Sequence, residues 1–337
     1  MTQVKLIDVA NKAGVSKSTA SQFLNGRYEY MSAATKERLD AAVKELGFVP
    51  NQLARSLKTK KSNTIGVMVN SINGPTTSDV IRGIDDHLKG EGYNVLIYNT
   101  DYNKDTELAS IANLVAQSAD GLIITSSGQI NALLNDEDHL GMPVVHIHRT
   151  FEGLTSNTVL SDFQTGAYDA SSYLIAQGHE RIAVITRSYE QIPSRQLRLE
   201  GYLSALKDNS ISIDHSLIQI ADDPERIHQI VPMLMALPEP PTAIFTMYAR
   251  LTKEVLYYCN THHIDIPQDL SIIGFDDLPM ASLFKSPLTV INQSSYDLGI
   301  ESAKLLVEKI NHPAQRQVDV VLPCHLIVRD STRSIKN

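Results

Sequence analysis

The first residues of the chain carry a helical pattern of apolar positions that predicts two short helices joined by a tight turn. Val9, Ala10 and Ala13 share one helical face. Gly14 follows where such a turn needs a left-handed backbone, and Ser16 is suited to cap the second helix. This pattern predicts a helix-turn-helix, whose second helix can enter the major groove of DNA. An ordinary helical corner with a solvated outer face would give the same pattern.

A third helix is expected over residues 33–46, with Ser32 as its cap and Gly47 as its end. Pro50 fits the start of a further short helix over residues 51–58, and the polar residues that follow are typical of a linker. The sequence therefore predicts an all-α head over residues 1–48 and a hinge helix with linker over residues 49–63.

From residue 64 onward, short apolar runs alternate with stretches of helical periodicity. Buried strands are expected at residues 64–69, 94–98, 121–125, 143–148, 182–186, 217–220, 243–246 and 270–275. Helices are expected at residues 80–88, 106–115, 165–176, 195–206 and 224–237. This alternation predicts doubly wound parallel sheets, and its second round, beginning near residue 163, predicts two lobes within residues 64–337.

The charge of the chain is divided unevenly between head and body. Of 337 residues, 30 are lysine or arginine and 38 are aspartate or glutamate, a net charge of −8. The first 61 residues hold 11 of the cations and five of the anions, which leaves 19 cations against 33 anions in the remainder. We therefore expect only the basic head to meet the phosphates of a nucleic acid.

Cysteine use and hydropathy indicate a cytoplasmic protein. Cys259 and Cys324 stand far apart without metal-type spacing, which favours a reducing compartment. The N-terminus has no apolar stretch of the secretory type, and no apolar run is long enough to span a membrane. The sequence predicts no membrane partner.

Turn, caps and hinge segment follow one another in a specific order along the head. The residues concerned are Leu6–Ala10, Ala13–Ser16, Ser21, Asn25, Ser32, Thr35, Leu46–Phe48, Pro50–Asn51 and Ala54–Leu57. In this order they resemble the head of the LacI/GalR family of repressors, with one extra residue in the loop over residues 27–31. The resemblance implies a sequence-specific regulator that binds double-stranded DNA.

The resemblance also implies which head residues contact DNA. Lys17, Ser18 and Gln22 correspond to base-reading positions, where lysine can address guanine and glutamine can address adenine. The family most often has arginine at the position of Gln22, so we expect the operator to differ there. The complete implied set is Ser16, Lys17, Ser18, Thr19, Ser21, Gln22, Asn25, Asn51, Ala54, Arg55 and Leu57.

Among these, Ala54 and Leu57 resemble hinge residues that enter the minor groove. Leu57 would be the apolar wedge that kinks the DNA, although it could instead pack against its own domain. An isolated helix of eight residues is marginal in water, so we expect the hinge to form only on DNA, paired with that of a second subunit. A homodimer and a near-palindromic operator follow from this pairing.

The body resembles the same family through residues 177–182, 198–202, 266–271 and 274–277, which implies a two-lobed fold like that of periplasmic sugar-binding proteins. Ligands of doubly wound sheets bind at the carboxyl ends of strands. This rule and the resemblance select as effector contacts Asn70, Thr76, Thr77, Ser126, His148, Arg149, Ser194, Arg198, Tyr248, Arg250 and Asp276.

Arg198 and Asp276 match the arginine and aspartate that grip the effector in this family, although a helix-surface cation and a turn-capping carboxylate are the alternatives. Two departures bear on the ligand. The chain has Ala249 where relatives often have aspartate, and threonines at positions 76 and 77 where purine-binding members have aromatic residues. The sequence therefore favours a small anionic polyol, such as a sugar acid or sugar phosphate, over a nucleobase or a neutral hexose.

The sequence shows no catalytic constellation. It contains neither GxGxxG nor a P-loop, so no nucleotide cofactor is expected, and His146 and His148 have no further metal ligand at suitable spacing. An α/β enzyme would need a nucleophile–base pair or a metal cluster, and a transport solute-binding protein would need a signal peptide. An effector-controlled repressor is therefore the favoured function. Activation instead of repression, and inducer instead of co-repressor, stay open.

Overall fold

The computed structural model describes residues 4–48, 61–189 and 192–336. These residues form two compact units, Met1–Ser62 and Asn63–Asn337, which are described separately here. Among the described helices, none combines the length and the apolar character that crossing a membrane requires.

The head consists of three helices around a small core, as predicted. Its helices are α1 (Leu6–Lys12), α2 (Lys17–Leu24) and α3 (Ala33–Leu46). The core is formed by Val9, Ala10, Ala13, Ala20, Leu39 and Ala42. Gly14 has a φ of +64° in the turn between α1 and α2, and Gly47 has a φ of +58° just after α3. Both are backbone conformations that glycine adopts without a Cβ penalty.

The first lobe of the body is a parallel sheet with helices on both faces. Its elements are β1 (Thr64–Val69), α5 (Thr77–Gly90), β2 (Asn94–Asn99), α6 (Lys104–Ala116), β3 (Gly121–Ile124), α7 (Asn131–Leu134), α8 (Glu137–Leu140), β4 (Val144–Ile147), β5 (Asn157–Ser161), α13 (Ser295–Asn311) and β11 (Asp319–Leu322). The strand order is β11-β5-β4-β3-β1-β2. The apolar strands β1, β3 and β4 lie inside this sheet because they can be buried on both faces.

The second lobe repeats this architecture. Its elements are α9 (Phe163–Ala176), β6 (Ile182–Thr186), α10 (Pro193–Asp208), η1 (His215–Leu217), β7 (Ile218–Ile220), η2 (Pro224–Arg226), α11 (Ile227–Met235), β8 (Ala243–Thr246), α12 (Ala249–Thr261), β9 (Ser271–Phe275), η3 (Ala281–Leu283), β10 (Thr289–Asn292) and β12 (His325–Ile327). The strand order is β12-β10-β9-β8-β6-β7, with β12 antiparallel to β10. The other strand pairs of this sheet are parallel, as predicted for a doubly wound fold.

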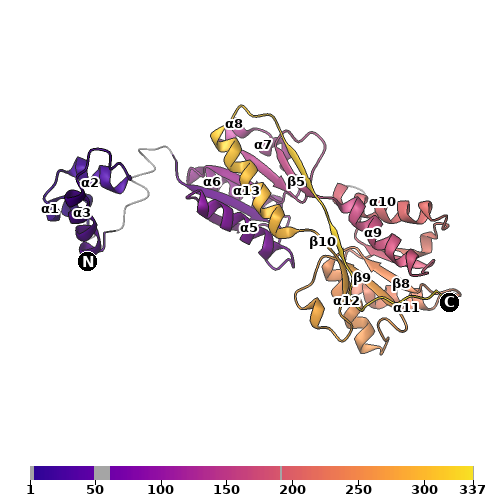
Figure 1. The fold of residues 1–337 in the computed structure, drawn as a ribbon. Helices are drawn as coiled ribbons and strands as arrows, with labels where there is room; N and C mark the ends of the chain where they lie inside the picture. Colours follow the sequence, from indigo (N-terminus) through magenta and orange to yellow (C-terminus); the bar gives the residue numbers. More distant parts are fainter. Residues whose placement is uncertain (1–3, 49–60, 190–191, 337) are drawn as a thin grey trace. The chain divides into compact units, whose positions relative to one another are not determined.

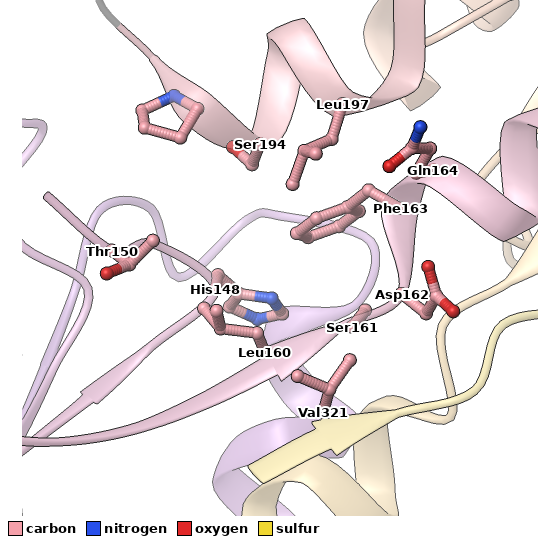
Figure 2. Close-up of a pocket in the computed structure, with 11 residues that line it drawn as sticks. His148, Thr150, Leu160, Ser161, Asp162, Phe163, Gln164, Ser194, Leu197 and Val321 are labelled. Carbon is pink, nitrogen blue, oxygen red and sulfur yellow. The ribbon is translucent and has the colours of Figure 1, made fainter. Parts of the chain in front are cut away.

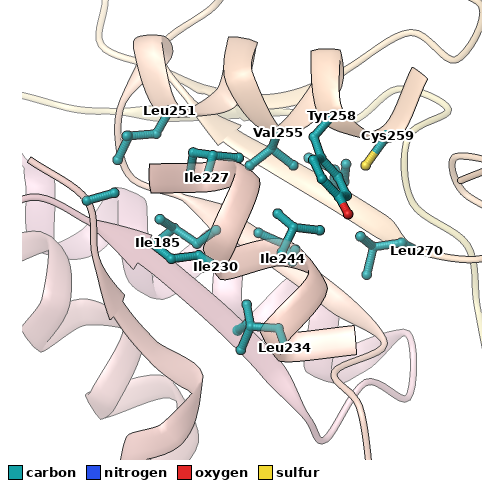
Figure 3. Close-up of a cluster of buried hydrophobic side chains, with 14 of the residues drawn as sticks. Ile185, Ile227, Ile230, Leu234, Ile244, Leu251, Val255, Tyr258, Cys259 and Leu270 are labelled. Atoms are coloured by element: carbon teal, nitrogen blue, oxygen red, sulfur yellow. The ribbon is translucent and has the colours of Figure 1, made fainter. Parts of the chain in front are cut away.

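The two faces of the second sheet carry separate apolar cores. On one face, Ile227, Ile230 and Leu234 of α11 pack with Val255 of α12 over Ile244 of β8 (Figure 3). On the other face, α9 and α10 cover the sheet. Continuous burial of the strands on both faces explains why their sequences are apolar without alternation.

The chain crosses between the lobes between β5 and α9, again between β10 and α13, and again between β11 and β12 (Figure 1). The second crossing brings α13 and β11 to the first lobe, and the third returns the chain to the second lobe. Each lobe is therefore assembled from segments distant in sequence. The region after β4 and the starts of α9 and α10 therefore lie close to these connections.

Helices α5 and α13 pack closely in the first lobe because glycines lie at their contact (Figure 1). A Cβ added to Gly83 would lie 2.1 Å from the carbonyl oxygen of Tyr296. One added to Gly299 would lie 2.2 Å from the carbonyl oxygen of Val80. Neither obstacle is a flexible side chain, so a larger residue would force the two helix backbones apart.

We predict that Gly299→Ala lowers the free energy of unfolding of the body by about 1–3 kcal/mol, because an extra methyl group overpacks this contact. Urea unfolding of the full chain, followed by far-UV circular dichroism, measures the change. Gly90→Ala is the matched control, because a Cβ at the end of α5 meets nothing within 4 Å. Equal stability of the two variants would contradict the prediction.

Candidate functional site

The second helix of the head presents polar side chains on its outer surface. Ser16 caps α2, because its Oγ accepts a hydrogen bond from the backbone N–H of Thr19 at 3.1 Å. Ala20 is fully buried, whereas Lys17, Ser18 and Gln22 are exposed. The exposed face therefore carries the residue types that read base edges in the major groove.

The other head residues expected at DNA are more involved in holding the helix. Thr19 is half-buried, with its Oγ1 at 2.8 Å from the Oγ of Ser16. The side-chain amide of Asn25 donates to the carbonyl oxygen of Ser21 at 2.7 Å and so helps to close the end of α2. The hinge contacts expected at Asn51, Ala54, Arg55 and Leu57 lie outside the described residues.

The body contains a cleft of about 870 Å³ lined by residues of both lobes. It lies at the carboxyl ends of several strands, as doubly wound folds require. The sequence-predicted residues that line it are Asn70, Thr76, Thr77, His148, Arg149, Ser194, Arg198, Tyr248, Arg250 and Asp276. The structure therefore brings together side chains that are more than 200 positions apart in the sequence.

Ser126 is the exception among the expected effector contacts. It is fully buried, and its Oγ accepts a hydrogen bond from the backbone N–H of Gly128 at 3.0 Å. The preceding residue, Thr125, lines the cleft instead. Ser126 therefore lies outside the lining of the cleft, whereas its neighbour at the end of β3 belongs to it.

On the first-lobe wall, Arg149 is held against an aromatic ring. Its guanidinium carbon lies 4.0 Å from the ring centroid of Tyr102, and Nη1 donates to the carbonyl oxygen of Ser126 at 3.4 Å. Arg149 is buried, with 6% of its surface exposed. A stacked guanidinium keeps its charge and its remaining donors at low conformational cost.

On the second-lobe wall, three arginines surround Tyr248. The guanidinium carbons of Arg198, Arg195 and Arg187 lie 5.0, 5.5 and 5.8 Å from the centroid of its ring. Nε of Arg195 donates to the Tyr248 hydroxyl at 3.2 Å. Burial alone would raise the pKa of the Tyr248 phenol, but the charges of Arg198 and Arg195 lower it below its usual value.

The guanidinium of Arg198 also packs against two phenylalanine rings. Its guanidinium carbon lies 3.9 Å from the ring centroid of Phe275 and 4.7 Å from that of Phe163. Nη1 donates to the carbonyl oxygen of Met247, whereas the buried Nε has no hydrogen-bond partner among the described residues. The side chain is thus fixed in place while one buried N–H donor stays unsatisfied.

Asp276 supplies a carboxylate to the same wall. Its Oδ1 accepts a hydrogen bond from the side-chain amide of Gln293. Burial raises the pKa of Asp276, opposed by Arg198, by Gln293 and by the backbone N–H of Ala249. Its φ of +79° is an uncommon conformation for aspartate, of the kind that concentrates at binding sites.

His148 lies between the cleft and a second, smaller cavity. This cavity, of about 110 Å³, shares His148, Phe163 and Ser194 with the cleft. Leu197 extends into it from α10 toward the ring of Phe163 (Figure 2). Burial, together with the charges of Arg198 and Arg149, lowers the pKa of His148 to about 4. At neutral pH the imidazole is therefore uncharged and adds no further repulsion to this cationic site.

Several cleft residues were not among the expected effector contacts. The lining also includes Asn73, Asp101, Tyr102, Thr125, Phe163, Arg187, Lys253 and Gln293. Arg187 directly follows β6, so the rule that ligands bind at the carboxyl ends of strands would have indicated it. Gln293 likewise directly follows β10, whereas Lys253 projects from within α12 and carried no such signal.

The described residues contain no group of three His, Cys, Asp or Glu side chains placed to hold a metal ion. His146 is fully buried in β4, and neither ring nitrogen has a hydrogen-bond partner among these residues. Burial lowers the pKa of His146 to about 4. His146 is thus fully buried, whereas His148 is half-buried and lines the cleft.

Comparison with known families and structures covers both units. Residues 5–51 match the family model described as bacterial regulatory proteins, lacI family, and residues 172–332 match the periplasmic binding protein-like domain. The transcriptional repressor CytR of Escherichia coli strain K12 is 33% identical over 336 residues, which cover 99% of this chain and 98% of the relative.

Two solved structures extend the likeness to three dimensions. One is the lac repressor dimer bound to operator and the anti-inducer ONPF, with a TM-score of 0.84 and 25% identity, covering 98% of this chain and all of that one. The other is a complex of the transcriptional regulator CelR with cellobiose, with a TM-score of 0.71 and 27% identity over 98% and 100% of the two chains.

We predict that the free energy of unfolding falls as the pH is lowered from 6.5 toward 4. His146 and His148 are neutral in the folded protein, whereas the unfolded chain binds a proton at each near pH 6.5. Each site contributes a slope of up to about 1.4 kcal/mol per pH unit in this range. His146→Leu removes one of these two imidazoles and should reduce the slope measured by urea unfolding. An unchanged slope would contradict the assignment to His146.

Proposed function

The chain belongs to the LacI family of bacterial regulatory proteins and is a DNA-binding transcriptional repressor, and we propose that a small anionic carbohydrate in the interlobe cleft controls it. The head would bind operator DNA through α2, and the body would bind the effector. Proteins of this family are regulators and not enzymes. Effector binding would act on operator affinity through the hinge segment.

The cleft supplies the two kinds of contact that a charged carbohydrate requires. Asp276, Gln293 and Asn70 are polar groups suited to hydroxyls. Arg149 and Arg198 supply fixed positive charge. Aromatic residues that line the cleft, Tyr102, Phe163 and Tyr248, offer apolar surface, but they are already stacked on arginines. This occupation supports a polar, anionic ligand over a nucleobase, which needs a free aromatic face.

The observation that carries the proposal is the charge of the cleft lining. Five of its side chains are cationic, namely Arg149, Arg187, Arg198, Arg250 and Lys253, against the two carboxylates of Asp101 and Asp276. Arg149 and Arg198 are buried, so their like charges are weakly screened, and an anion that enters the cleft relieves their repulsion. A neutral sugar would leave the excess charge uncompensated.

Control of DNA binding would require a dimer. Two heads related by a two-fold axis read two half-sites, so the operator would be a near-palindrome. Effector-dependent closure of the lobes would change the separation of the two hinge segments and with it the affinity for the operator. The lac repressor, which this chain resembles in structure, is a dimer bound to its operator.

We expect Gln22→Ala to relax operator specificity at one base position of each half-site. A bidentate glutamine–adenine contact is worth about 1–3 kcal/mol, so each half-site should lose roughly 5- to 100-fold in affinity while nonspecific binding stays near its wild-type value. Selection of operators from random DNA with both proteins, followed by fluorescence anisotropy, measures the effect. Tyr30→Ala, a change in the loop after α2, is the exposed control. Identical selected sequences for wild type and Gln22→Ala would exclude base reading by Gln22.

We also expect sugar acids or sugar phosphates, but not the parent neutral sugars, to change operator affinity of the full chain. Fluorescence anisotropy on the selected operator, with each ligand titrated, tests this response. Arg198→Met should abolish it, because the substitution removes the stacked cation from the cleft. Arg226→Met removes an exposed cation of the same lobe outside the cleft and should retain it. A stronger response to a neutral sugar than to its acid or phosphate would refute the anionic effector.

A further inference from the structure

The second-lobe wall of the cleft gathers positive charge with few carboxylate partners. Arg187, Arg195 and Arg198 all flank the ring of Tyr248. Among the described residues, the only carboxylate within 4.0 Å of their nitrogens is Asp222, whose Oδ1 lies 3.7 Å from Nε of Arg187. Helices α10 and α12 begin at this wall with no acidic residue in their first turns, so their positive ends add to the field.

The three arginines differ in how many of their donors are already used. Arg195 donates from Nε to the Tyr248 hydroxyl and from Nη1 to the carbonyl oxygen of Ser188 at 2.6 Å. Arg187 and Arg198 each have a buried Nε without a hydrogen-bond partner among the described residues. Arg198 is 94% buried, since 6% of its surface is exposed. Nε of Arg187 faces the carboxylate of Asp222 at 3.7 Å, whereas Nε of Arg198 faces no carboxylate among the described residues. Because an unpaired buried donor is costly, the N–H of Arg198 indicates an acceptor that arrives with a ligand.

We infer that Arg187 and Arg198 form a subsite for a phosphate-sized dianion, with Arg195 as the positioning residue that fixes Tyr248 between them. The inference rests on the proposed function, because it specifies the anionic group of the effector: a phosphate monoester rather than a carboxylate. The hydroxyl-bearing part of the ligand then lies toward Asp276 and Gln293, since the Asp276 carboxylate would repel the phosphate.

The charge of the lining selects a dianion over a monoanion. Its five cations and two carboxylates leave an excess of three positive charges; just outside the lining, Arg195 beside Tyr248 adds one and Asp222 beside Arg187 offsets one. His148 adds none at neutral pH, because its pKa is lowered to about 4 by burial and the neighbouring arginines. A phosphate monoester carries about −1.5 to −2 at pH 7 and so compensates more of this excess than a carboxylate, which carries a single negative charge. Arginine forks also match the geometry of phosphate oxygens.

Direct binding of inorganic phosphate to the full chain without DNA tests the subsite. Isothermal titration calorimetry at pH 7.5 and constant ionic strength should show saturable binding in the millimolar range, at a stoichiometry of one per chain. Acetate should bind much more weakly under the same conditions. Equal binding of acetate and phosphate, or no saturable binding of phosphate, would overturn the inference.

Variants locate the site and separate charge from donor geometry. Arg187→Met should weaken phosphate binding about tenfold or more, because it removes a charge-assisted hydrogen bond. Arg187→Lys keeps the charge without the Nε donor and should restore only part of the affinity. Arg226→Met is the matched control and should bind phosphate as the wild type does. Wild-type affinity of Arg187→Met would overturn the assignment, and thermal unfolding without ligand checks that each variant is folded.

The outcomes also separate the subsite from the proposed function. Saturable phosphate binding that Arg187→Met weakens supports the subsite even if no sugar phosphate changes operator affinity, a result that would count against effector control alone. An operator response to sugar acids that Arg187→Met leaves intact would support effector control and overturn the phosphate subsite.

Discussion

The buried guanidinium of Arg198 is the constraint on which the chemistry of the body depends. Three aromatic rings surround it and one backbone carbonyl accepts from it, but among the described residues no carboxylate pairs with it directly. A charge in such surroundings must be compensated at longer range. Its field adds to the burial that lowers the pKa of His148, lowers the pKa of Tyr248 against the effect of burial, and opposes the effect of burial on Asp276. These neighbouring groups thus adjust to one cation.

The fold places this cation where a ligand can reach it. Arg198 lies on α10, which packs with α9 on one face of the second sheet, and its end meets Phe275 at the carboxyl end of β9. The cleft is completed by Arg149 and Tyr102 from the first lobe. Because the chain crosses between lobes at neighbouring points, both walls belong to one unit. A ligand that touches both walls therefore bears on the relation between the lobes, which is the element an effector must bias.

Apolar runs predicted the inner strands well because burial on both faces leaves a strong signal. The strands at β6 and β8 have the expected limits, residues 182–186 and 243–246. The strand β5 was not expected, since Asn157 and Thr158 make it polar at its start. The edge strands β11 and β12 are also partly exposed, so they lack the continuous apolar run that marks an inner strand. Of the cleft, the sequence indicated residues at strand ends, but it gave no sign of the stacking of arginines on Tyr102, Phe163 and Tyr248, which exists only after distant segments meet.

The net charge of the chain and the charge of its sites have opposite signs. Both can hold because charges act on a site only over short distances. Beyond residue 61, 33 carboxylates outnumber 19 cations, yet the cleft in this part has an excess of cations. At physiological ionic strength, exposed charges are screened over about 8 Å, so distant surface carboxylates contribute little inside a cleft. Buried arginines are screened much less and determine the local potential. The same screening lets the basic head attract DNA phosphates although the rest of the chain is acidic.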